Sequence, residues 1–182
     1  MAAPSRVLVL GGQRSGKSRY AEALVAASGR RLVYLATATP GDSEMQERIA
    51  AHRARRGEGR WHTIEEPLDL AGALWRAARV DTAVLVDCLT LWLTNLMGAE
   101  RDVEQETGRL TATLAKIAGP VVIVSNEVGS GIIPANALAR RYADELGTMN
   151  QRVAEAVDRV MLVAAGMPLV LKPTQKQNEV AL

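Results

Sequence analysis

The sequence has little of three things that would narrow its class: cysteine, aromatic residues and net charge. A single cysteine, Cys88, excludes an internal disulfide and any metal site built from several cysteines. Phenylalanine is absent and aromatic residues make up 3% of the chain, so aliphatic side chains have to form the core, as in sheets covered by helices on both faces. The formal net charge of +2 is too small to indicate a nucleic-acid surface by itself.

Long hydrophobic runs are missing too. No apolar run approaches the roughly 20 residues that a bilayer-spanning helix needs, and the apolar stretch within the first ten residues is too short for the core of a signal peptide. These features predict a cytoplasmic protein with no membrane insertion. With 182 residues, 48% of them hydrophobic, the chain has the size and composition of one globular domain.

Short aliphatic runs alternate with longer stretches of helical pattern. The runs expected to form strands buried on both faces are 7–10, 32–36, 83–86, 121–125 and 160–164, with 169–171 as a candidate edge strand. The stretches expected to form helices are 17–28, 43–56, 68–79, 89–97, 102–118 and 135–157. This alternation predicts an open, mostly parallel sheet in a single α/β domain over residues 1–173, followed by a polar C-terminal tail at 174–182.

The most specific motif is a phosphate-binding loop, which fits G-x-x-x-x-G-K-[ST] between a strand pattern and a helix pattern. It consists of Gly11, Gly12, Gln13, Arg14, Ser15, Gly16, Lys17 and Ser18. Its glycines allow the backbone amides to wrap around phosphates, and the following helix offers its N-terminal amides to the same anion. Lys17 would reach the β- and γ-phosphates, and the Ser18 hydroxyl would ligate Mg²⁺. A glycine-rich turn that binds nothing is the weaker alternative.

An acid follows the apolar run 83–86. Because parallel strands open onto the ligand crevice at their C-terminal ends, we expect Asp87 to lie near the Mg²⁺. Capping of the next helix is the alternative role for this side chain. The phosphate-binding loop favours the metal role.

A histidine lies among arginines on the predicted helix 43–56. Arg48, Arg55 and Arg56 are three or four residues from His52 and therefore share its face. Such a cluster could hold phosphates and would favour the neutral, nucleophilic imidazole. Spacing alone nevertheless favours a simpler interpretation, a solvated basic helix. The other histidine, His62, is predicted to be a structural polar residue just before a loop.

A second polar loop, residues 125–134, follows another buried run. Its glycines and Glu127 indicate a functional loop at the end of the sheet where sites form. A plain turn that leads into a helix cap is the alternative. Thr90 and Asn95, on the predicted helix after Asp87, either face the same crevice or pack against the sheet.

A longer ordered set of residues extends these motifs along nearly the whole chain. Besides residues 11–18, it comprises Tyr34-Leu35-Ala36-Thr37, Glu44-Met45, Arg48-Ile49, His52-Arg53, Trp61 with Glu65, Asp87-Cys88-Leu89-Thr90, Asn95-Leu96, Asn126-Glu127-Val128-Gly129, Gly131-Ile132 with Pro134, Asn150-Gln151 and Lys172-Pro173. In this set the chain resembles the adenosylcobinamide kinase / adenosylcobinamide-phosphate guanylyltransferase family of cobalamin biosynthesis. The phosphate-binding loop alone is shared by many nucleotide-binding proteins, whereas the ordered set is far more specific.

The resemblance implies a bifunctional enzyme with a RecA-like P-loop fold, a corrinoid substrate and a homotrimeric assembly. In the first reaction, ATP or GTP gives its γ-phosphoryl group to the hydroxyl of the cobinamide aminopropanol arm. In the second, GTP gives GMP to His52 with loss of pyrophosphate, and the GMP passes to adenosylcobinamide phosphate. This role for His52 replaces the simpler interpretation that its spacing favours.

The resemblance also assigns roles to individual residues. The implied catalytic residues are His52 and Lys17, and the implied magnesium ligands are Ser18 and Asp87. Besides residues 11–18, the implied nucleotide contacts are Ala36, Thr37, Ala38, Arg53, Ala54, Arg55, Arg56, Glu65 and Asp87. The chain departs from many relatives at Gly57, where they carry proline. Members also differ between glutamate and aspartate at position 87, and the shorter Asp87 would reach Mg²⁺ through water.

Two other functions stay open on the residues alone. One is a single-activity small-molecule kinase on the same scaffold, in which His52 is inert. The other is a nucleotide-binding regulatory or assembly module that hydrolyses slowly and switches partners. The kinase predicts no covalent nucleotide adduct, and the regulatory module predicts no phosphorylated small molecule.

Overall fold

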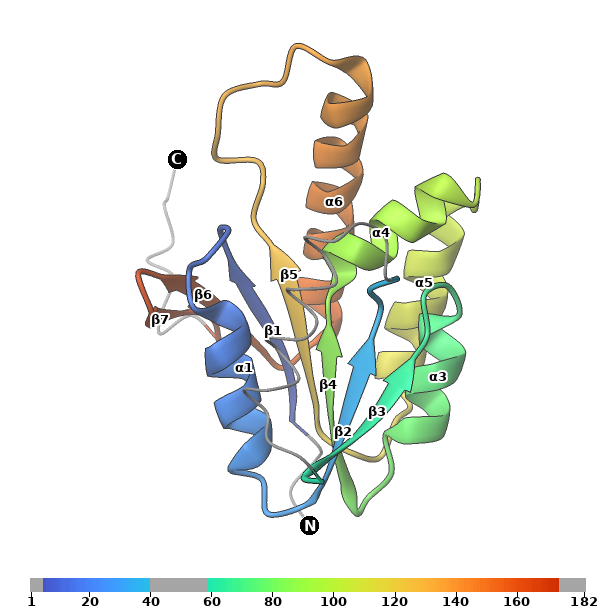
Figure 1. Cartoon of the computed structure of the whole chain (residues 1–182), viewed down its shortest axis with the longest axis vertical. Helices are drawn as coiled ribbons and strands as arrows, with labels where there is room; N and C mark the ends of the chain where they lie inside the picture. Colours follow the sequence, from blue (N-terminus) through green and yellow to red (C-terminus); the bar gives the residue numbers. More distant parts are fainter. Residues whose placement is uncertain (1–4, 40–58, 174–182) are drawn as a thin grey trace, which may run out of the picture.

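The structure is a computed structural model and describes residues 5–39 and 59–173 (Figure 1). Its strands are β1 (Arg6–Gly11), β2 (Arg31–Ala36), β3 (Trp61–Glu65), β4 (Thr82–Asp87), β5 (Val121–Asn126), β6 (Arg159–Ala164) and β7 (Met167–Lys172). Its helices are α1 (Lys17–Ala26), α3 (Leu70–Ala77), α4 (Leu89–Gly98), α5 (Val103–Leu114) and α6 (Ala137–Ala156). The predicted helix 43–56 and the predicted tail 174–182 lie outside the described residues.

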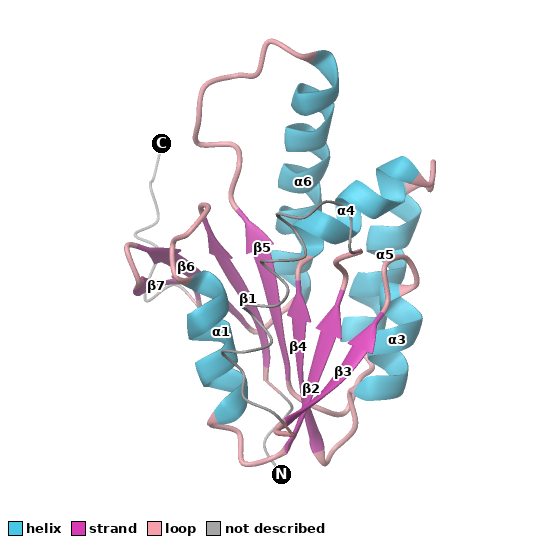
Figure 2. Ribbon diagram, in the orientation of Figure 1, coloured by secondary structure: helices cyan, strands magenta, loops and turns pink. Residues whose placement is uncertain are grey.

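The seven strands form one sheet in the order β3-β2-β4-β5-β1-β6-β7. Neighbouring strands from β3 to β6 are parallel, and β7 returns antiparallel to β6. Figure 2 shows α1 on one face of this sheet and α3, α4, α5 and α6 on the other. The mostly parallel α/β sheet predicted from the alternation is confirmed. None of the described helices is long and apolar enough to span a membrane.

The core forms two layers, one on each face of the sheet, because side chains alternate along each strand. Along β1, Leu8 joins the cluster under α3–α6, whereas Val7 and Val9 join the cluster under α1. The largest fully buried side chain is Trp92 on α4, whose indole N–H donates to the Leu68 carbonyl oxygen at 2.9 Å. Both layers are largely aliphatic, as the absence of phenylalanine predicts.

One strand, β3, was not predicted from the sequence. We expected His62 just before a loop, but it lies within β3 with its side chain exposed. Only Trp61 and Ile64 of this strand are half-buried, so the segment lacks the apolar run that marks the other parallel strands. The reason is its position at the end of the sheet, where β2 is its one neighbour among the described strands.

Helix ends are set by caps that shorten the predicted ranges. The side chain of Asp69 accepts a hydrogen bond from the Gly72 amide, so α3 begins at Leu70 rather than at residue 68. The side chain of Asn136 accepts from the amides at the start of α6, which begins at Ala137 rather than at residue 135. Polar caps within the predicted stretches thus decide the first helical residue.

Candidate functional site

The parallel register brings the C-terminal ends of the strands to one edge, called here the carboxyl edge. On this edge Ala36 lies beside Glu65 of β3 and Asp87 of β4, and Gly11 lies beside Asn126 of β5. Since β5 separates β1 from β4, the phosphate-binding loop and Asp87 lie two strands apart. The structure therefore gathers at one edge residues that are far apart in the sequence.

The phosphate-binding loop depends on glycine at two positions. A Cβ at Gly11 would meet Ser15 Oγ and lie 2.6 Å from the Val163 carbonyl oxygen, too close for any side chain. Gly16 has φ +95° and is the N-cap of α1, with no side-chain hydrogen bond to the helix. The first amides of α1 are thus not capped by a side chain and face the loop, as in anion sites at helix N-termini. The Gly166 amide also donates to the Ser15 carbonyl oxygen at 2.8 Å and ties the loop to the β6–β7 turn.

Lys17 is half-buried at the start of α1, and its ammonium donates to the Gly12 carbonyl oxygen at 3.1 Å. Burial lowers the pKa of Lys17 from its ordinary value, and the neighbouring Cys88 and Asp87 act in the opposite direction. Asp87, the acid at the end of β4, therefore acts on the charge of Lys17. A cation and an anion thus flank the place where the loop would hold a nucleotide.

An aromatic pair, the buried Tyr34 and the half-buried Trp61, positions Asp87. The Tyr34 hydroxyl donates to Asp87 Oδ2 at 3.1 Å, and the Tyr34 ring packs edge-on against Trp61, with ring centroids 6.3 Å apart and planes at 88°. The alternative role for Asp87, capping the next helix, is not observed. The N-cap of α4 is Cys88, and no side chain caps that helix. The acid therefore lies at the carboxyl edge, where Tyr34 holds one of its oxygens.

Asn95 joins the ends of two strands. Its side-chain amide donates to the Thr37 carbonyl oxygen at 2.7 Å and to the Pro67 carbonyl oxygen at 3.1 Å, so it links the segments that follow β2 and β3. Thr37 is fully buried, and its hydroxyl donates to the Cys88 carbonyl oxygen at 2.7 Å and accepts from the Cys88 amide at 2.9 Å. Burial raises the pKa of the Cys88 thiol to about 11, so it stays neutral near pH 7. The half-buried Asn95 thus fixes the backbone at the carboxyl edge, and both roles left open for it stay predictions.

The end of β5 is held by two helices and by the phosphate-binding loop. The Asn126 amide donates to Thr90 Oγ1 on α4 at 3.0 Å, and the Asn126 carbonyl oxygen accepts from the Asn150 side chain on α6 at 3.0 Å. The next amide, that of Glu127, donates to the Gly11 carbonyl oxygen at 3.1 Å. Thr90 therefore fixes the backbone at the end of β5.

The polar loop after β5 is shaped by Glu127 and leads into an exposed arm. Glu127 Oε1 accepts from the Gly129 and Ser130 amides at 2.7 and 3.1 Å, which closes the turn. Beyond it, Ile132 and Ile133 are 98% and 80% exposed. Figure 1 shows this loop and the first part of α6 extending beyond the carboxyl edge. Residues 128–141 are called the arm below.

The predicted site residues divide into those the structure places and those it does not describe. At the carboxyl edge it places Gly11, Gly12, Gln13, Arg14, Ser15, Gly16, Lys17, Ser18, Ala36, Thr37, Ala38, Glu65 and Asp87. Outside the described residues lie His52, Arg53, Ala54, Arg55 and Arg56. Sequence reasoning gave no role to the side chains of Tyr34 and Asn150. The only sequence feature that pointed to these two residues was their membership of the ordered set. Their contacts, with Asp87 and with Asn126, join parts of the chain that are distant in sequence.

A magnesium site would draw on Ser18 and Asp87. No group of three or more histidine, cysteine, aspartate or glutamate side chains that could hold a metal occurs in ranges 5–39 and 59–173. Mg²⁺ in nucleotide sites needs fewer protein ligands, because phosphates and waters supply most of the oxygens. One carboxylate and one hydroxyl beside a phosphate-binding loop are donors of the right kind.

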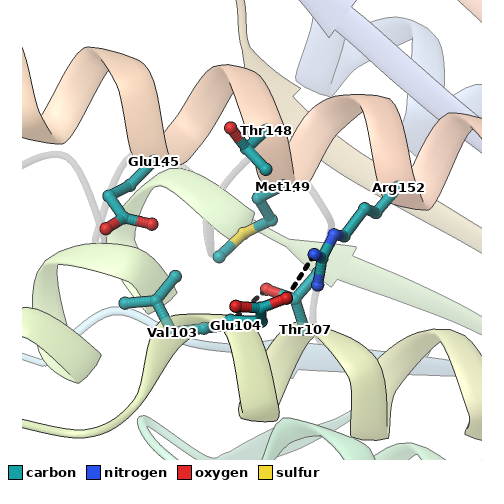
Figure 3. A pocket seen from close by; sticks show the side chains of 7 residues that line it. All are labelled: Val103, Glu104, Thr107, Glu145, Thr148, Met149 and Arg152. Atoms are coloured by element: carbon teal, nitrogen blue, oxygen red, sulfur yellow. Dashed lines mark hydrogen bonds and ion pairs between the residues drawn. The ribbon is translucent and has the colours of Figure 1, made fainter.

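A small pocket elsewhere is separate from this site. Its volume is about 100 Å³, and it lies between α5 and α6, with an ion pair of 2.6 Å between Glu104 and Arg152 on its wall (Figure 3). The remaining lining residues are Val103, Thr107, Glu145, Thr148 and Met149. None of the residues that the sequence predicts for nucleotide or metal binding lines it.

Solved structures share the fold. The RadB recombinase has a TM-score of 0.54 at 17% identity, covering 88% of this chain and 74% of its own. A Pyrococcus horikoshii protein, PH0250, has a TM-score of 0.58 at 9% identity, covering 97% and 90%. At such identities the likeness concerns the fold alone, and it confirms the RecA-like P-loop fold expected from the sequence.

Sequence relatives are closer. Residues 7–171 match the family model for cobinamide kinase / cobinamide phosphate guanyltransferase. The bifunctional adenosylcobalamin biosynthesis protein CobP of Pseudomonas aeruginosa is 49% identical over 169 residues, covering 92% of this chain and 97% of its own. The corresponding protein CobU of Salmonella typhimurium is 39% identical over 181 residues, covering 91% and 99%. The chain therefore belongs to the cobinamide kinase / cobinamide phosphate guanyltransferase family, and it is an enzyme.

Proposed function

We propose that this enzyme phosphorylates adenosylcobinamide with ATP or GTP, and then transfers GMP from GTP through a covalent GMP–His52 intermediate to give adenosylcobinamide-GDP. Membership of a bifunctional family supports the two activities. One observation carries the nucleotide chemistry: the phosphate-binding loop and Asp87 meet at the same edge of the sheet. A cytoplasmic location and the absence of a nucleic-acid partner stay predictions from the sequence.

In the kinase step, this chain's residues bind and orient the triphosphate. The amides of the loop and of the first turn of α1 would hold the phosphate oxygens. Lys17 would leave the Gly12 carbonyl oxygen and pair with the β- and γ-phosphates. Ser18 and Asp87 would hold Mg²⁺, which when bound neutralises charge on these phosphates, and the Tyr34 hydroxyl would keep the carboxylate of Asp87 in place.

In the guanylyl step, an imidazole nitrogen of His52 attacks the α-phosphorus of GTP. A nitrogen–phosphorus bond forms, the bond from the α-phosphorus to the bridging oxygen breaks, and pyrophosphate leaves with the electron pair. An oxygen of the corrinoid phosphate then attacks the same phosphorus and releases the imidazole. The match at His52-Arg53 and the basic residues around it support this route, although they lie outside the described residues.

Incubation with Mg²⁺ and GTP labelled at the α-phosphate tests the covalent step. The wild-type protein is expected to acquire acid-labile, alkali-stable label, because a phosphoramidate hydrolyses in acid. The variant His52→Ala is expected to acquire none. The matched control is His62→Ala, which removes the only other histidine, an exposed one on β3, and should label like the wild type. A folded, GTP-binding wild type without label would leave a single-activity kinase.

We also propose that the protein is a homotrimer in which the arm of one copy packs on the next. Ile132, Ile133 and Leu138 support this, since they are 98%, 80% and 65% exposed and belong to the arm, the segment that extends beyond the carboxyl edge in Figure 1. Large exposed apolar side chains that are close in sequence, as here, are typical of association surfaces. The number of copies, three, is the one that the family resemblance implies.

Light scattering tests the assembly. The wild type is expected at about three times the chain mass of 19.5 kDa. The double variant Ile132→Asp/Ile133→Asp is expected to run as a single chain, because two buried carboxylates would cost far more than they contribute. The control Val80→Asp alters another exposed apolar side chain, 59% exposed, and should not change the mass. A wild type at 19.5 kDa would contradict the trimer, and an unchanged double variant would contradict the role of the arm.

A further inference from the structure

The backbone of Asn126 is fixed by hydrogen bonds, whereas its side-chain oxygen lacks a donor among the described residues. Its amide and carbonyl groups are held by Thr90 and Asn150, at 3.0 Å each. Its side-chain oxygen, Oδ1, is buried and has no hydrogen-bond partner in the part of the chain that the structure describes. A buried acceptor without a donor costs about 1–3 kcal/mol. Such an acceptor is a candidate for a hydrogen bond from a bound ligand.

The alternation of β5 places this side chain on the face of the phosphate-binding loop. Val122 and Val124 pack in the cluster that includes Ala21 and Val25 of α1. Asn126 is the next residue with the same orientation, because side chains repeat every second residue along a strand. Its register partner is Gly11, the first residue of the loop, and the amide after it donates to Gly11.

The acid and the base of the proposed nucleotide site lie on this same face. Ala83 and Leu85 of β4 belong to the cluster under α1, so Asp87 continues on that face, consistent with its electrostatic interaction with Lys17. Since β5 lies between β1 and β4, Asn126 lies between the phosphate-binding loop and Asp87.

The hydrogen-bonding groups of the two reactants indicate which of them could donate to Asn126 Oδ1. Phosphate oxygens of a nucleoside triphosphate are acceptors near neutral pH and cannot satisfy a carbonyl oxygen. An alcohol can, because its hydroxyl donates one hydrogen bond and keeps lone pairs for attack. We propose that Asn126 Oδ1 accepts a hydrogen bond from the substrate hydroxyl in the kinase step and so aims its oxygen at the γ-phosphorus. This inference rests on the proposed function.

Phosphoryl transfer to the substrate hydroxyl does not require Asn126 to act as a base. The hydroxyl oxygen forms a bond to the γ-phosphorus, and the bond from that phosphorus to the β–γ bridging oxygen breaks, leaving its electron pair on the nucleoside diphosphate. The hydroxyl proton stays hydrogen-bonded to Asn126 during attack and then passes to an oxygen of the transferred phosphoryl group. An amide oxygen is too weak a base to keep it. Asn126 is thus an orienting catalytic residue.

The second reaction has no such requirement. Its nucleophiles are an imidazole nitrogen and then an oxygen of a phosphate monoester, and the attacking oxygen carries no proton when the monoester is a dianion. Loss of the acceptor at Asn126 should therefore slow phosphorylation and spare formation of the GMP adduct. A merely structural role would lower both activities and nucleotide binding together.

The test compares Asn126→Ala and Asn126→Asp with the wild type in three assays: adenosylcobinamide phosphorylation, nucleotide dissociation constant and α-phosphate labelling by GTP. For Asn126→Ala we expect kcat of phosphorylation to fall about 100-fold, with a dissociation constant within twofold and an unchanged labelling rate. Asn126→Asp keeps an acceptor oxygen and should recover at least tenfold of the lost kcat.

Other outcomes overturn the inference in distinguishable ways. An unchanged kcat in Asn126→Ala, beside a wild type that phosphorylates the corrinoid, refutes the role of Asn126 and leaves the proposed function standing. Parallel losses of phosphorylation, nucleotide binding and labelling in both variants show a structural role only. A wild type that labels with GTP but phosphorylates no corrinoid refutes the kinase function, and this inference with it.

Discussion

Replacement of Lys17 with alanine is expected to lower kcat/KM of the kinase reaction by about 10³-fold. The reason is that its ammonium is the charged donor that would follow the γ-phosphoryl group through the transition state. Within the described part of the chain its ammonium donates to the Gly12 carbonyl oxygen, an exposed contact, so its removal should leave the unfolding temperature nearly unchanged. Steady-state kinetics and thermal unfolding measure both. A loss smaller than tenfold would contradict the assignment.

The alkaline pH dependence provides a second measurement on the same side chain. Burial lowers the pKa of Lys17 below the ordinary value of 10.5, so its positive charge is full below the lowered pKa and is lost as the pH rises through it. Nucleotide affinity of the free enzyme should therefore fall on the alkaline side earlier than for an ordinary lysine. In Lys17→Arg the guanidinium stays charged, and the fall should move to higher pH. An alkaline fall at the same pH in both proteins would show that another group titrates.

The sequence alone could predict the phosphate-binding loop and Asp87, because each depends on local pattern. A glycine-rich motif between a strand and a helix is recognisable wherever it occurs. A carboxylate at the end of an apolar run has to reach the carboxyl edge once the sheet is parallel. Both predictions needed the strand type and no knowledge of distant contacts.

The contacts that orient this site could not be predicted in the same way. Tyr34 reaches Asp87 across 53 positions, and Asn95 reaches Thr37 across 58. Both contacts exist only because β2 and β4 are neighbours in the sheet, an order that periodicity does not determine. The strand β3 was not predicted for another reason. It lies at the end of the sheet with most of its side chains exposed, so its sequence shows no apolar run.

Asn95→Asp is expected to have the largest effect on stability among isosteric changes at this site. The substitution keeps the shape of the side chain and replaces its amide donor with a carboxylate oxygen. That oxygen would face the carbonyl oxygens of Thr37 and Pro67, at 2.7 and 3.1 Å from the present donor. Two carbonyl groups would lose their donor and meet negative charge. We expect a loss of about 3 kcal/mol in the free energy of unfolding, which for a chain of this size is roughly 6–12 °C.

The effect should extend to the nucleotide, since Thr37 is a predicted contact and its backbone is what Asn95 holds. Thermal unfolding and a nucleotide dissociation constant, measured on the same preparation, separate the two consequences. The matched control is Thr94→Ala on the neighbouring position of α4, where the lost hydrogen bond runs to Thr90 within the helix and is exposed. If Asn95→Asp unfolds at the control's temperature, the two carbonyl groups do not depend on this amide. If Asn95→Asp is destabilised yet binds nucleotide like the control, the hydrogen bonds of Asn95 stabilise the fold without shaping the nucleotide site. The prediction that Thr37 contacts the nucleotide would then be wrong.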